Sequence, residues 1–466
     1  MSHRNSTSKK SASKTHIVAG LFAGVGGIEK GLHQAGHRAT LLCENDSGAT
    51  EVLRARFPKI PLCGDVCALK SLPRETTLVA AGFPCQDLSQ AGKTTGIAGA
   101  RSGLVGEVFR LLERHRTPWV LLENVPFMLQ LGRGEAMNVI TSALENLGYS
   151  WAYRVVDART FGLPQRRRRV YLVASNEADP RTVLFADEAG QADRPELNGH
   201  PVACGFYWTE GIRGLGWAVD AIPTLKGGST IGIPSSPAIL LPNGEVVTPD
   251  IRDAERLQGF PAGWTKPAEL VAKKGARWKL VGNAVSVPAA AWVGRRLARP
   301  GRVLEFVTSP MGQSKKWPTA AWNVDSERLA VAASEWPVRK QYISLESFLK
   351  YESAPLSAKA TSGFLRRTEV ARLRFPPGLI DALKEHLRRM SPPLKRAGSG
   401  GPGDVDRYAA RVPDRWTDLR FSLDQCPRRG SRTDSVTPGS ITHAATSIQR
   451  LRVGDCFSTS CTTVRS

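Results

Sequence analysis

Short apolar runs alternate with helical patterns from about residue 17 onward, and this alternation predicts the fold class. Six runs have the length and β-branched content of buried strands: IVAGLF (17–22), TLLCEN (40–45), TLVAAGF (77–83), WVLLENV (119–125), YRVVDA (153–158) and VYLVAS (170–175). Helix-like stretches lie between them, such as GIEKGLHQAG (27–36) and GLVGEVFRLLERH (103–115). Repeated strand–helix units predict an α/β fold, in which a doubly wound, Rossmann-like and mostly parallel sheet carries helices on both faces.

The pattern changes after Ser175, and this change predicts the domain organisation. Residues 176–251 are rich in Gly, Pro and Asn and short in helical period, which indicates a smaller, loop-rich domain. Helical signals return at 249–260, 284–298 and 379–390. The expected parts are a disordered basic arm (1–16), a main domain (17–175), a small domain (176–277), a return to the main domain (278–300), an accessory segment of unknown role (301–395) and a tail (396–466).

The composition of residues 396–466 differs sharply from that of the preceding chain. This stretch contains no Lys, Glu or Met and is rich in Gly, Ser, Thr, Arg and Pro. Such a composition predicts a disordered tail. A frameshifted or unselected extension would have the same composition, so the sequence leaves both interpretations open.

The net charge indicates the class of partner. The 466 residues include 64 Lys and Arg against 42 Asp and Glu, a formal charge of +22. This surplus favours a polyanion, either nucleic acid or an acidic membrane surface. No apolar run approaches the roughly 20 residues that span a bilayer, and the N-terminal residues lack the apolar core of a secretory signal. The eight cysteines are scattered, which is typical of cytoplasmic thiols rather than of a disulfide framework.

Glycines follow the first predicted strand, and an acid follows the second. Gly24, Gly26 and Gly27 allow a tight turn and a close approach of the backbone to a ligand. Glu29 stands at the third glycine position of G-x-G-x-x-G, which disfavours a dinucleotide oxidoreductase. Glu44 lies about 20 residues on, where an acid typically binds ribose hydroxyls. Each feature alone could be an ordinary turn or an exposed carboxylate, whereas together they indicate a nucleoside-bearing cofactor.

Two further strands end in reactive residues. GFPCQ (82–86) places Cys85 just beyond the third strand, and Glu123 ends the fourth. A cysteine nucleophile and a glutamate proton donor on neighbouring strand ends suit addition to an electron-poor ring. Taken singly, Cys85 could be a small buried residue and Glu123 a solvated loop carboxylate.

A basic run, QRRRR (165–169), precedes the last of these strands. Strand alternation places Arg167 and Arg169 on one face and Arg166 and Arg168 on the other. One pair could then face the site while the other meets phosphates. The alternative is a solvated basic run.

In this order, the residues resemble the DNA (cytosine-5) methyltransferase family, over about Ile17 to Leu297. Six motifs carry the resemblance: LFAGVGG (21–27) for the cofactor loop, GFPCQ (82–86) for the nucleophile, ENV (123–125) for the acid, QRRRR (165–169) for Q-x-R-x-R, and RDAERLQGFP (252–261) and GNAVSVP (282–288) for the last two. The resemblance implies a class I S-adenosylmethionine-dependent methyltransferase fold. Residues 17–175 would form its catalytic and cofactor-binding domain, and 176–277 its target-recognition domain.

The family's chemistry implies S-adenosyl-L-methionine as methyl donor and a flipped-out cytosine of double-stranded DNA as acceptor, because C5 and C6 are out of reach in a stacked duplex. By resemblance, Cys85 adds to C6 and Glu123 engages N3 and the exocyclic amine. Arg169 would hold O2 of the base. Arg167 would support the nucleophile or a neighbouring phosphate.

The resemblance also implies the binding residues. Phe22 would lie against the adenine, Glu44 on the ribose and Asp65 on the adenine amine. The cofactor site would be completed by Gly24, Gly26, Gly27, Pro84, Leu104 and Asn283. The DNA contacts would come from Gln86, Ser89, Gln165, Thr224 and Leu225. The first two belong to the stretch 86–103, which resembles the family's mobile catalytic loop; the alternative is an ordinary flexible surface loop. No metal site is expected, since Cys63 and Cys67 have no second ligand pair.

The sequence thus predicts a cytoplasmic, sequence-specific DNA cytosine-5 methyltransferase that acts as a monomer on DNA. It would be either a solitary modification enzyme or the partner of a restriction endonuclease with the same site. Two alternatives remain open: a cytosine-5 methyltransferase acting on RNA, and a catalytically silent DNA-binding relic.

Overall fold

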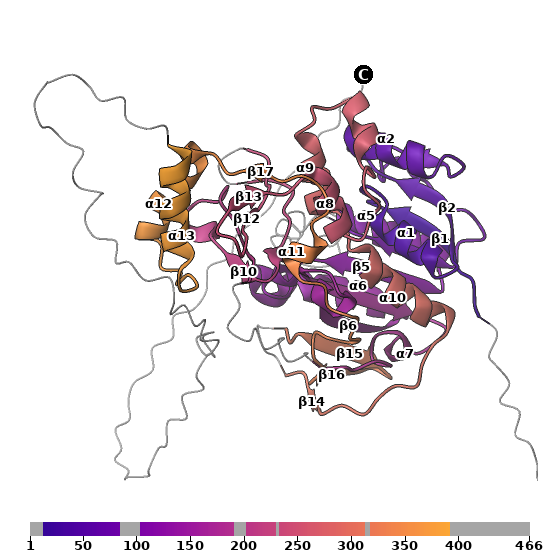
Figure 1. Cartoon of the computed structure of the whole chain (residues 1–466). Helices are drawn as coiled ribbons and strands as arrows, with labels where there is room; N and C mark the ends of the chain where they lie inside the picture. The colour runs from indigo at the N-terminus through magenta and orange to yellow at the C-terminus, as the bar shows by residue number, and fades with distance from the viewer. Residues whose placement is uncertain (1–12, 84–102, 191–201, 230–232, 313–316, 392–466) are drawn as a thin grey trace, which may run out of the picture. The chain divides into compact units, whose positions relative to one another are not determined.

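A ten-stranded sheet, built from strands between Ile17 and Val331, is the largest element of the fold (Figure 1). The computed structural model describes residues 13–83, 103–190, 202–229, 233–312 and 317–391, all within the contact unit Met1–Phe421. The strand order is β14-β16-β15-β6-β8-β5-β4-β1-β2-β3. The strands are β1 (Ile17–Leu21), β2 (Arg38–Cys43), β3 (Leu62–Cys63), β4 (Leu78–Ala81), β5 (Trp119–Asn124), β6 (Ser150–Asp157), β8 (Arg168–Ser175), β14 (Thr308–Pro310), β15 (Ala320–Val324) and β16 (Glu327–Val331).

Each of the six predicted strands is present, and the fold class is confirmed. From β3 to β5 the strands pair in parallel, with register Gly20↔Ala80 between β1 and β4. Beyond β5 every pair is antiparallel, which the sequence did not predict. Only residues 158–167 join β6 to β8, and a parallel crossover needs a dozen residues or more. β8 therefore turns back and inserts between β5 and β6.

Helices cover both faces of the large sheet. Ala19 and Val79 point into a core under α5 (Leu104–His115) and α6 (Glu135–Asn146), whereas Val18 and Leu78 point into the opposite core with α1 (Gly27–Gln34) and α10 (Val287–Ala298). This alternation follows from the two-residue period of a strand. The last helix thus packs beside the first, and their backbones are so close that a Cβ on Gly31 would lie 2.6 Å from the Cβ of Ala290.

A second, smaller sheet has five antiparallel strands in the order β10-β9-β12-β13-β17. They are β9 (Cys204–Phe206), β10 (Trp217–Val219), β12 (Ala238–Leu240), β13 (Val246–Thr248) and β17 (Ala354–Pro355). The helices α12 (Ala358–Val370) and α13 (Leu379–Met390) share an apolar core with this sheet. The predicted helix over 379–390 is confirmed as α13. Residues 301–391 are therefore divided between the sheets, since β14 to β16 extend the large one.

Short elements connect the two sheets. β7 (Gln165–Arg166) pairs in parallel with β11 (Ile222–Pro223). The remaining elements are α2 (Ser47–Arg56), α7 (Arg181–Leu184), α8 (Ile251–Leu257), α9 (Ala276–Asn283), α11 (Leu345–Phe348), η1 (Pro126–Leu129), η2 (Leu131–Gly134), η3 (Ala158–Phe161), η4 (Ile212–Gly214) and η5 (Lys266–Leu270). Among the described residues, no helix has both the length and the apolar character to cross a membrane.

Candidate active site

The glycine turn after β1 has the backbone geometry that its sequence predicts. Phe22, Gly24 and Gly26 all have positive φ, at 54°, 55° and 81°. At Gly26 a side chain is excluded twice, because φ is left-handed and a Cβ would lie 2.4 Å from the ring of Phe57. A Cβ on Gly27 would lie 2.5 Å from the carbonyl oxygen of Val285. These contacts fix the turn against α2 and the segment before α10.

Glu44, which directly follows β2, fastens this turn. Its Oε2 accepts a hydrogen bond from the Gly24 N–H at 2.8 Å, and its Oε1 accepts from the N–H groups of Asn45 and Asp46 at 2.9 and 2.8 Å. The carboxylate and the glycine turn therefore adjoin at the carboxyl edge of the parallel strands.

The other cofactor residues predicted by resemblance occupy different positions around this edge. Asp65 is exposed, and its Oδ1 accepts a hydrogen bond from the Cys67 N–H at 2.9 Å. Leu104 begins α5 and, like Phe22, packs on the core while remaining partly accessible. Asn283 ends α9 and is exposed. Pro84 lies outside the described residues.

Glu123 is the penultimate residue of β5 and lies beside Gly82, which follows β4. Its carboxylate is buried, with Oε2 3.6 Å from the position of a Cβ on Gly82 and Oε1 3.1 Å from the Arg169 Nε. Burial raises the pKa of Glu123, and the guanidinium groups of Arg169 and Arg167 oppose this rise. A raised pKa shifts the carboxyl group toward its protonated form, which is the form that a proton donor requires.

Asn124 has a structural role that the sequence analysis missed. Its Nδ2 donates a hydrogen bond to the carbonyl oxygen of Phe83 at 3.0 Å, and its Oδ1 accepts from the Val125 N–H at 2.8 Å. This amide ties the end of β5 to the chain two residues before Cys85. Cys85, Gln86 and Ser89 lie outside the described residues. In the sequence, the only indication of this role for Asn124 is that its amide directly follows the acid in ENV. Its hydrogen-bond partner, Phe83, becomes evident only in the fold.

The predicted alternation along QRRRR is confirmed. Arg166 and Arg168 are exposed, whereas Arg167 and Arg169 are 1% and 9% exposed. Arg168 pairs with Glu335. The Arg169 Nη1 donates a hydrogen bond to the carbonyl oxygen of its neighbour Arg168 at 2.8 Å, and its Nε faces Glu123. One arginine of the buried pair thus reaches the acid.

Arg167 binds three backbone carbonyl oxygens from distant segments. Its Nη1 donates to Leu225 at 2.9 Å, and its Nη2 donates to Gly282 and Ala284 at 3.2 and 2.6 Å. Burial, reinforced by the charge of Arg169, lowers the pKa of Arg167 to about 9, which leaves it a cation at neutral pH. This side chain joins the Thr-Leu segment and the GNAV segment to β8.

Two of the residues predicted to contact DNA are buried in this structure. Gln165 is fully buried, donates through Nε2 to the carbonyl oxygen of Leu257 at 2.8 Å, and accepts from the Leu225 N–H at 3.1 Å. Leu225 is 2% exposed. Thr224 is partly exposed, and its hydroxyl donates to the carbonyl oxygen of Arg166 at 2.7 Å. Their DNA contacts stay predictions, while these bonds give them a role in holding the basic run in place.

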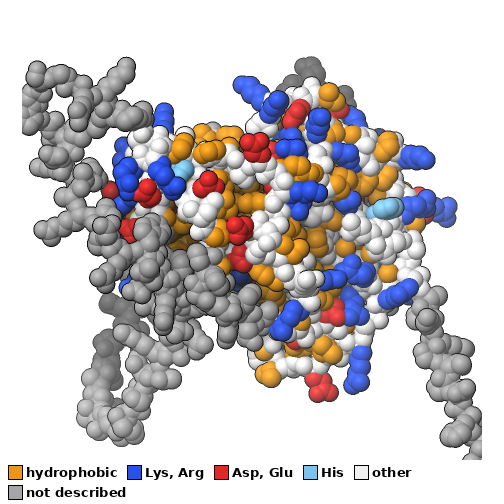
Figure 2. All heavy atoms as spheres, viewed as in Figure 1, with side chains coloured by type: hydrophobic (Ala, Val, Ile, Leu, Met, Phe, Trp, Pro, Cys, Tyr) orange, Lys and Arg blue, Asp and Glu red, His pale blue; other side chains and the backbone are white. Residues whose placement is uncertain are grey.

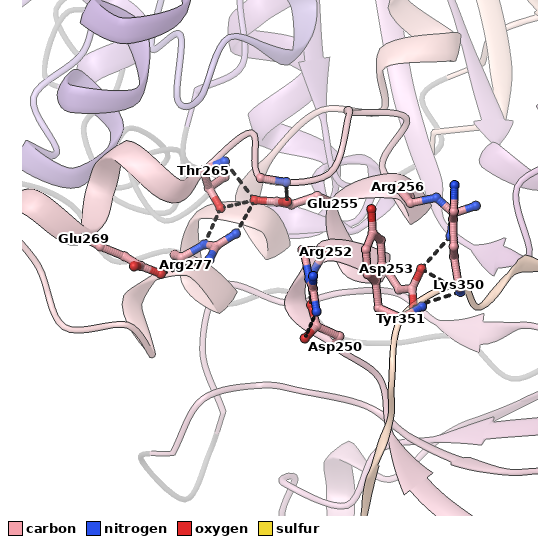
Figure 3. A network of polar contacts seen from close by, with 11 residues as sticks. Asp250, Arg252, Asp253, Glu255, Arg256, Thr265, Glu269, Arg277, Lys350 and Tyr351 are labelled. Carbon is pink, nitrogen blue, oxygen red and sulfur yellow. Dashed lines mark hydrogen bonds and ion pairs between the residues drawn. The ribbon is translucent and has the colours of Figure 1, made fainter.

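The charges of RDAERLQGFP form an internal network around α8 (Figure 3). Glu255 is fully buried and accepts hydrogen bonds from the N–H groups of Gly263 and Thr265 and from Arg277. Asp253 accepts from the N–H groups of Lys350 and Tyr351, in the segment that leads to β17. The charges of this motif therefore fasten α8 to α9 and to the segment that precedes β17.

Comparisons with known proteins agree with this geometry. The family model described as C-5 cytosine-specific DNA methylase matches residues 17–198. Type II methyltransferase M2.BsuMI of Bacillus subtilis (strain 168) is 49% identical over 362 residues, covering 75% of this chain and 92% of that protein. M.DsaV of Dactylococcopsis salina is 28% identical, covering 57% of this chain and 81% of that protein. The chain belongs to the C-5 cytosine-specific DNA methylase family.

Proposed function

We propose that the chain transfers a methyl group from S-adenosyl-L-methionine to C5 of a flipped-out cytosine in a specific sequence of double-stranded DNA. The observation that carries this proposal is the buried Glu123, held by Arg169 beside Gly82, three residues before Cys85. In this proposal, the proton donor Glu123 and the nucleophile Cys85 would act on one base from neighbouring strand ends.

The residues around the glycine turn fit a nucleoside-bearing cation. A Cβ on Gly24 or Gly64 would meet no atom within 4 Å, so the backbone is open on these sides. Glu44 offers its carboxylate to a ribose, Asp65 to an adenine amine, and the partly exposed Phe22 ring to an adenine face. Leu104, Pro84 and Asn283 would complete the site. The bound cofactor would supply a methyl group on a positively charged sulfur.

The protein's own residues then activate the base. The Cys85 thiolate adds to C6, which forms the Cys–C6 bond and moves electron density toward C5 and N3. Glu123, whose pKa is raised by burial, would donate a proton to N3 and so stabilise the product of this addition. Arg169 holds the cytosine O2. After methylation a base takes the C5 proton, and that electron pair re-forms the C5=C6 double bond as the Cys–C6 bond breaks. Cys85 leaves as a thiolate, and N3 returns its proton to Glu123.

Arg167 acts on this site as a positioning residue. Its three bonds to backbone carbonyl groups hold the β7–β8 strand connection against residues 225 and 282–284. Arg169 lies two residues further along the chain, in β8, so its orientation depends on these three bonds of Arg167. Because such preorganised charges need no rearrangement during the reaction, they stabilise its charged intermediates effectively.

The biological setting is proposed from the relatives, whose names describe Type II methyltransferases. We infer that the chain modifies one short DNA sequence, as a monomer on DNA, either alone or beside an endonuclease that cuts the unmodified sequence. The small sheet and residues 202–250 would supply the target recognition.

The test is expression in a host that lacks cytosine methylation, followed by conversion sequencing of the host DNA. We expect cytosines in one short motif to resist conversion with the intact chain and to lose this protection with Cys85→Ala. Purified Cys85→Ala should still bind DNA. Turnover by this variant would refute the nucleophile assignment. A soluble intact chain that protects no DNA cytosine would refute the substrate, and RNA would be tested next.

A further inference from the structure

The small sheet carries little positive charge of its own. Residues 202–250 contain two basic residues, Arg213 and Lys226, against four acids. Lys226 lies 3.6 Å from Glu210 and 3.9 Å from the centre of the Tyr207 ring, so its charge is partly offset. A recognition domain that approaches phosphates needs cations, because phosphate neutralisation supplies most of the sequence-independent affinity for DNA.

The helical segment packed on this sheet has the opposite balance. Residues 356–391 contain three acids and eight basic residues: Lys359, Arg366, Arg367, Arg372, Arg374, Lys384, Arg388 and Arg389. In Figure 2, blue side chains gather at the left, where Figure 1 places α12 and α13. The surplus that the small sheet lacks is therefore present on the helices that cover it.

Apolar packing makes α12 and α13 a fixed part of the small sheet. The rings of Phe364 and Phe206 lie 4.8 Å apart, and Leu379 and Leu383 are buried in the same core. The Leu356 N–H donates a hydrogen bond to the carbonyl oxygen of Val246 at 2.9 Å. Charges on these helices consequently keep a defined position relative to the recognition strands.

Four arginines lie in the stretch 366–374, which we name the basic turn: Arg366, Arg367, Arg372 and Arg374. Arg366, Arg372 and Arg374 are exposed, and none forms an ion pair with a carboxylate in the described part of the chain. The turn is anchored to the end of the sheet at β10: the Trp217 Nε1 donates to the Arg374 carbonyl oxygen at 2.9 Å, and Arg367 donates to the Trp208 carbonyl oxygen at 2.6 Å. The backbone of the basic turn is held in place, while the guanidinium groups of Arg366, Arg372 and Arg374 remain exposed.

We propose that the basic turn binds phosphates of double-stranded DNA outside the recognised sequence, so that α12 and α13 extend the recognition domain along the duplex. The inference rests on the proposed function, and it assigns a role to the segment after residue 355. Arginine suits this role because its planar fork matches phosphate oxygens and stays charged at every relevant pH.

The test compares Arg366→Gln/Arg372→Gln/Arg374→Gln with a matched control, Arg74→Gln/Arg299→Gln/Arg302→Gln. The control removes the same charge from exposed positions near the amino end of β4 and the end of α10. Binding of the full chain to a random-sequence duplex of about three helical turns is measured as a function of salt. We expect the slope of log K against log salt to fall by about 2 to 3 in the basic-turn variant and by less than about 1 in the control.

Two further measurements separate the possible outcomes. The triple Arg→Lys variant keeps the charge and should retain most of the slope. A random-sequence duplex of about one turn is too short to contact the basic turn and the rest of the DNA-binding surface together, so it should show a smaller difference between wild type and variant. Equal slopes for the two Gln triples would overturn the proposal. If the wild type protects no DNA cytosine in cells, the proposed function fails instead, so the two failures are distinguishable.

Discussion

The same residue type serves in two opposite environments in this protein. Arg167 and Arg169 are almost completely buried and are held by carbonyl oxygens and by Glu123. In the basic turn, by contrast, Arg366, Arg372 and Arg374 are exposed and form no ion pair among the described residues. Buried cations contribute through fixed geometry, and their loss leaves polar groups without partners. Exposed cations contribute through long-range attraction that salt screens. Substitutions of Arg167, Arg169 and Glu123 should therefore change the methyl-transfer rate and the stability of the fold. Substitutions in the basic turn should change the affinity for DNA.

The largest effect on methyl transfer is expected from Glu123→Gln. The amide cannot transfer a proton to N3, so we expect methyl transfer to unmethylated DNA to slow by about 10²- to 10⁴-fold. Transfer of labelled methyl groups under single-turnover conditions measures this directly. Glu177→Gln, an exposed carboxylate at the other end of the sheet, serves as the matched control and should retain full activity. A Glu123→Gln rate within about threefold of the wild type would contradict the assignment.

A large effect on folding is expected from Arg167→Met. The substitution leaves the carbonyl groups of Leu225, Gly282 and Ala284 without their donor, so the free energy of unfolding should fall by about 2 to 5 kcal/mol. Denaturant titration measures this loss. The neighbouring exposed Arg168→Met breaks only the surface pair with Glu335 and should cost less than about 1 kcal/mol. Equal losses would show that burial does not distinguish the two arginines.

A pH-dependent effect is expected at Glu29, which lies fully buried in α1 with both carboxylate oxygens lacking partners among the described residues. Burial, with a contribution from the charge of Glu44, raises the pKa of Glu29 from an ordinary 4.5 to about 8. Its stabilising contribution is therefore fully present below about pH 4.5 and lost as the pH rises through about 8. At pH 8 to 9, the free energy of unfolding of Glu29→Gln should therefore exceed that of the wild type by about 1 to 3 kcal/mol, because the neutral amide does not ionise.

The measurement for Glu29→Gln is thermal or denaturant unfolding across pH 5 to 9. The exposed Glu75→Gln is the control and should follow the wild-type profile. A stability difference between Glu29→Gln and wild type that stays constant over this range would show that the carboxyl group does not titrate there.

The smallest effect is expected from deleting residues 396–466. The composition of this stretch lacks the apolar content of a core, and both sheets and the basic turn precede it. Methylation rate, unfolding midpoint and salt dependence of DNA binding should all remain unchanged. A reduced salt slope after the deletion would show that the tail supplies phosphate contacts of its own, and loss of activity would show that it is required.

The sequence alone determined the features that depend on local order. Strand length and β-branched content predicted β1, β2, β4, β5, β6 and β8, and the two-residue period correctly separated buried Arg167 and Arg169 from their exposed neighbours. The glycine turn after the first strand and Glu44 after the second were predicted to serve one nucleoside-bearing cofactor. In the structure Glu44 accepts a hydrogen bond from Gly24 in that turn. These inferences need only neighbouring residues and general rules of chain connection.

Tertiary structure decided which distant groups meet. The antiparallel half of the sheet, the carbonyl partners of Arg167 and the bond from Asn124 to Phe83 all join segments that no local period relates. The chain after residue 301 was predicted as one accessory segment of unknown role, yet it extends the large sheet and then covers the small one. A periodic pattern specifies which face of an element is apolar, but many surfaces could bury that face, and only the packing of the whole chain selects one.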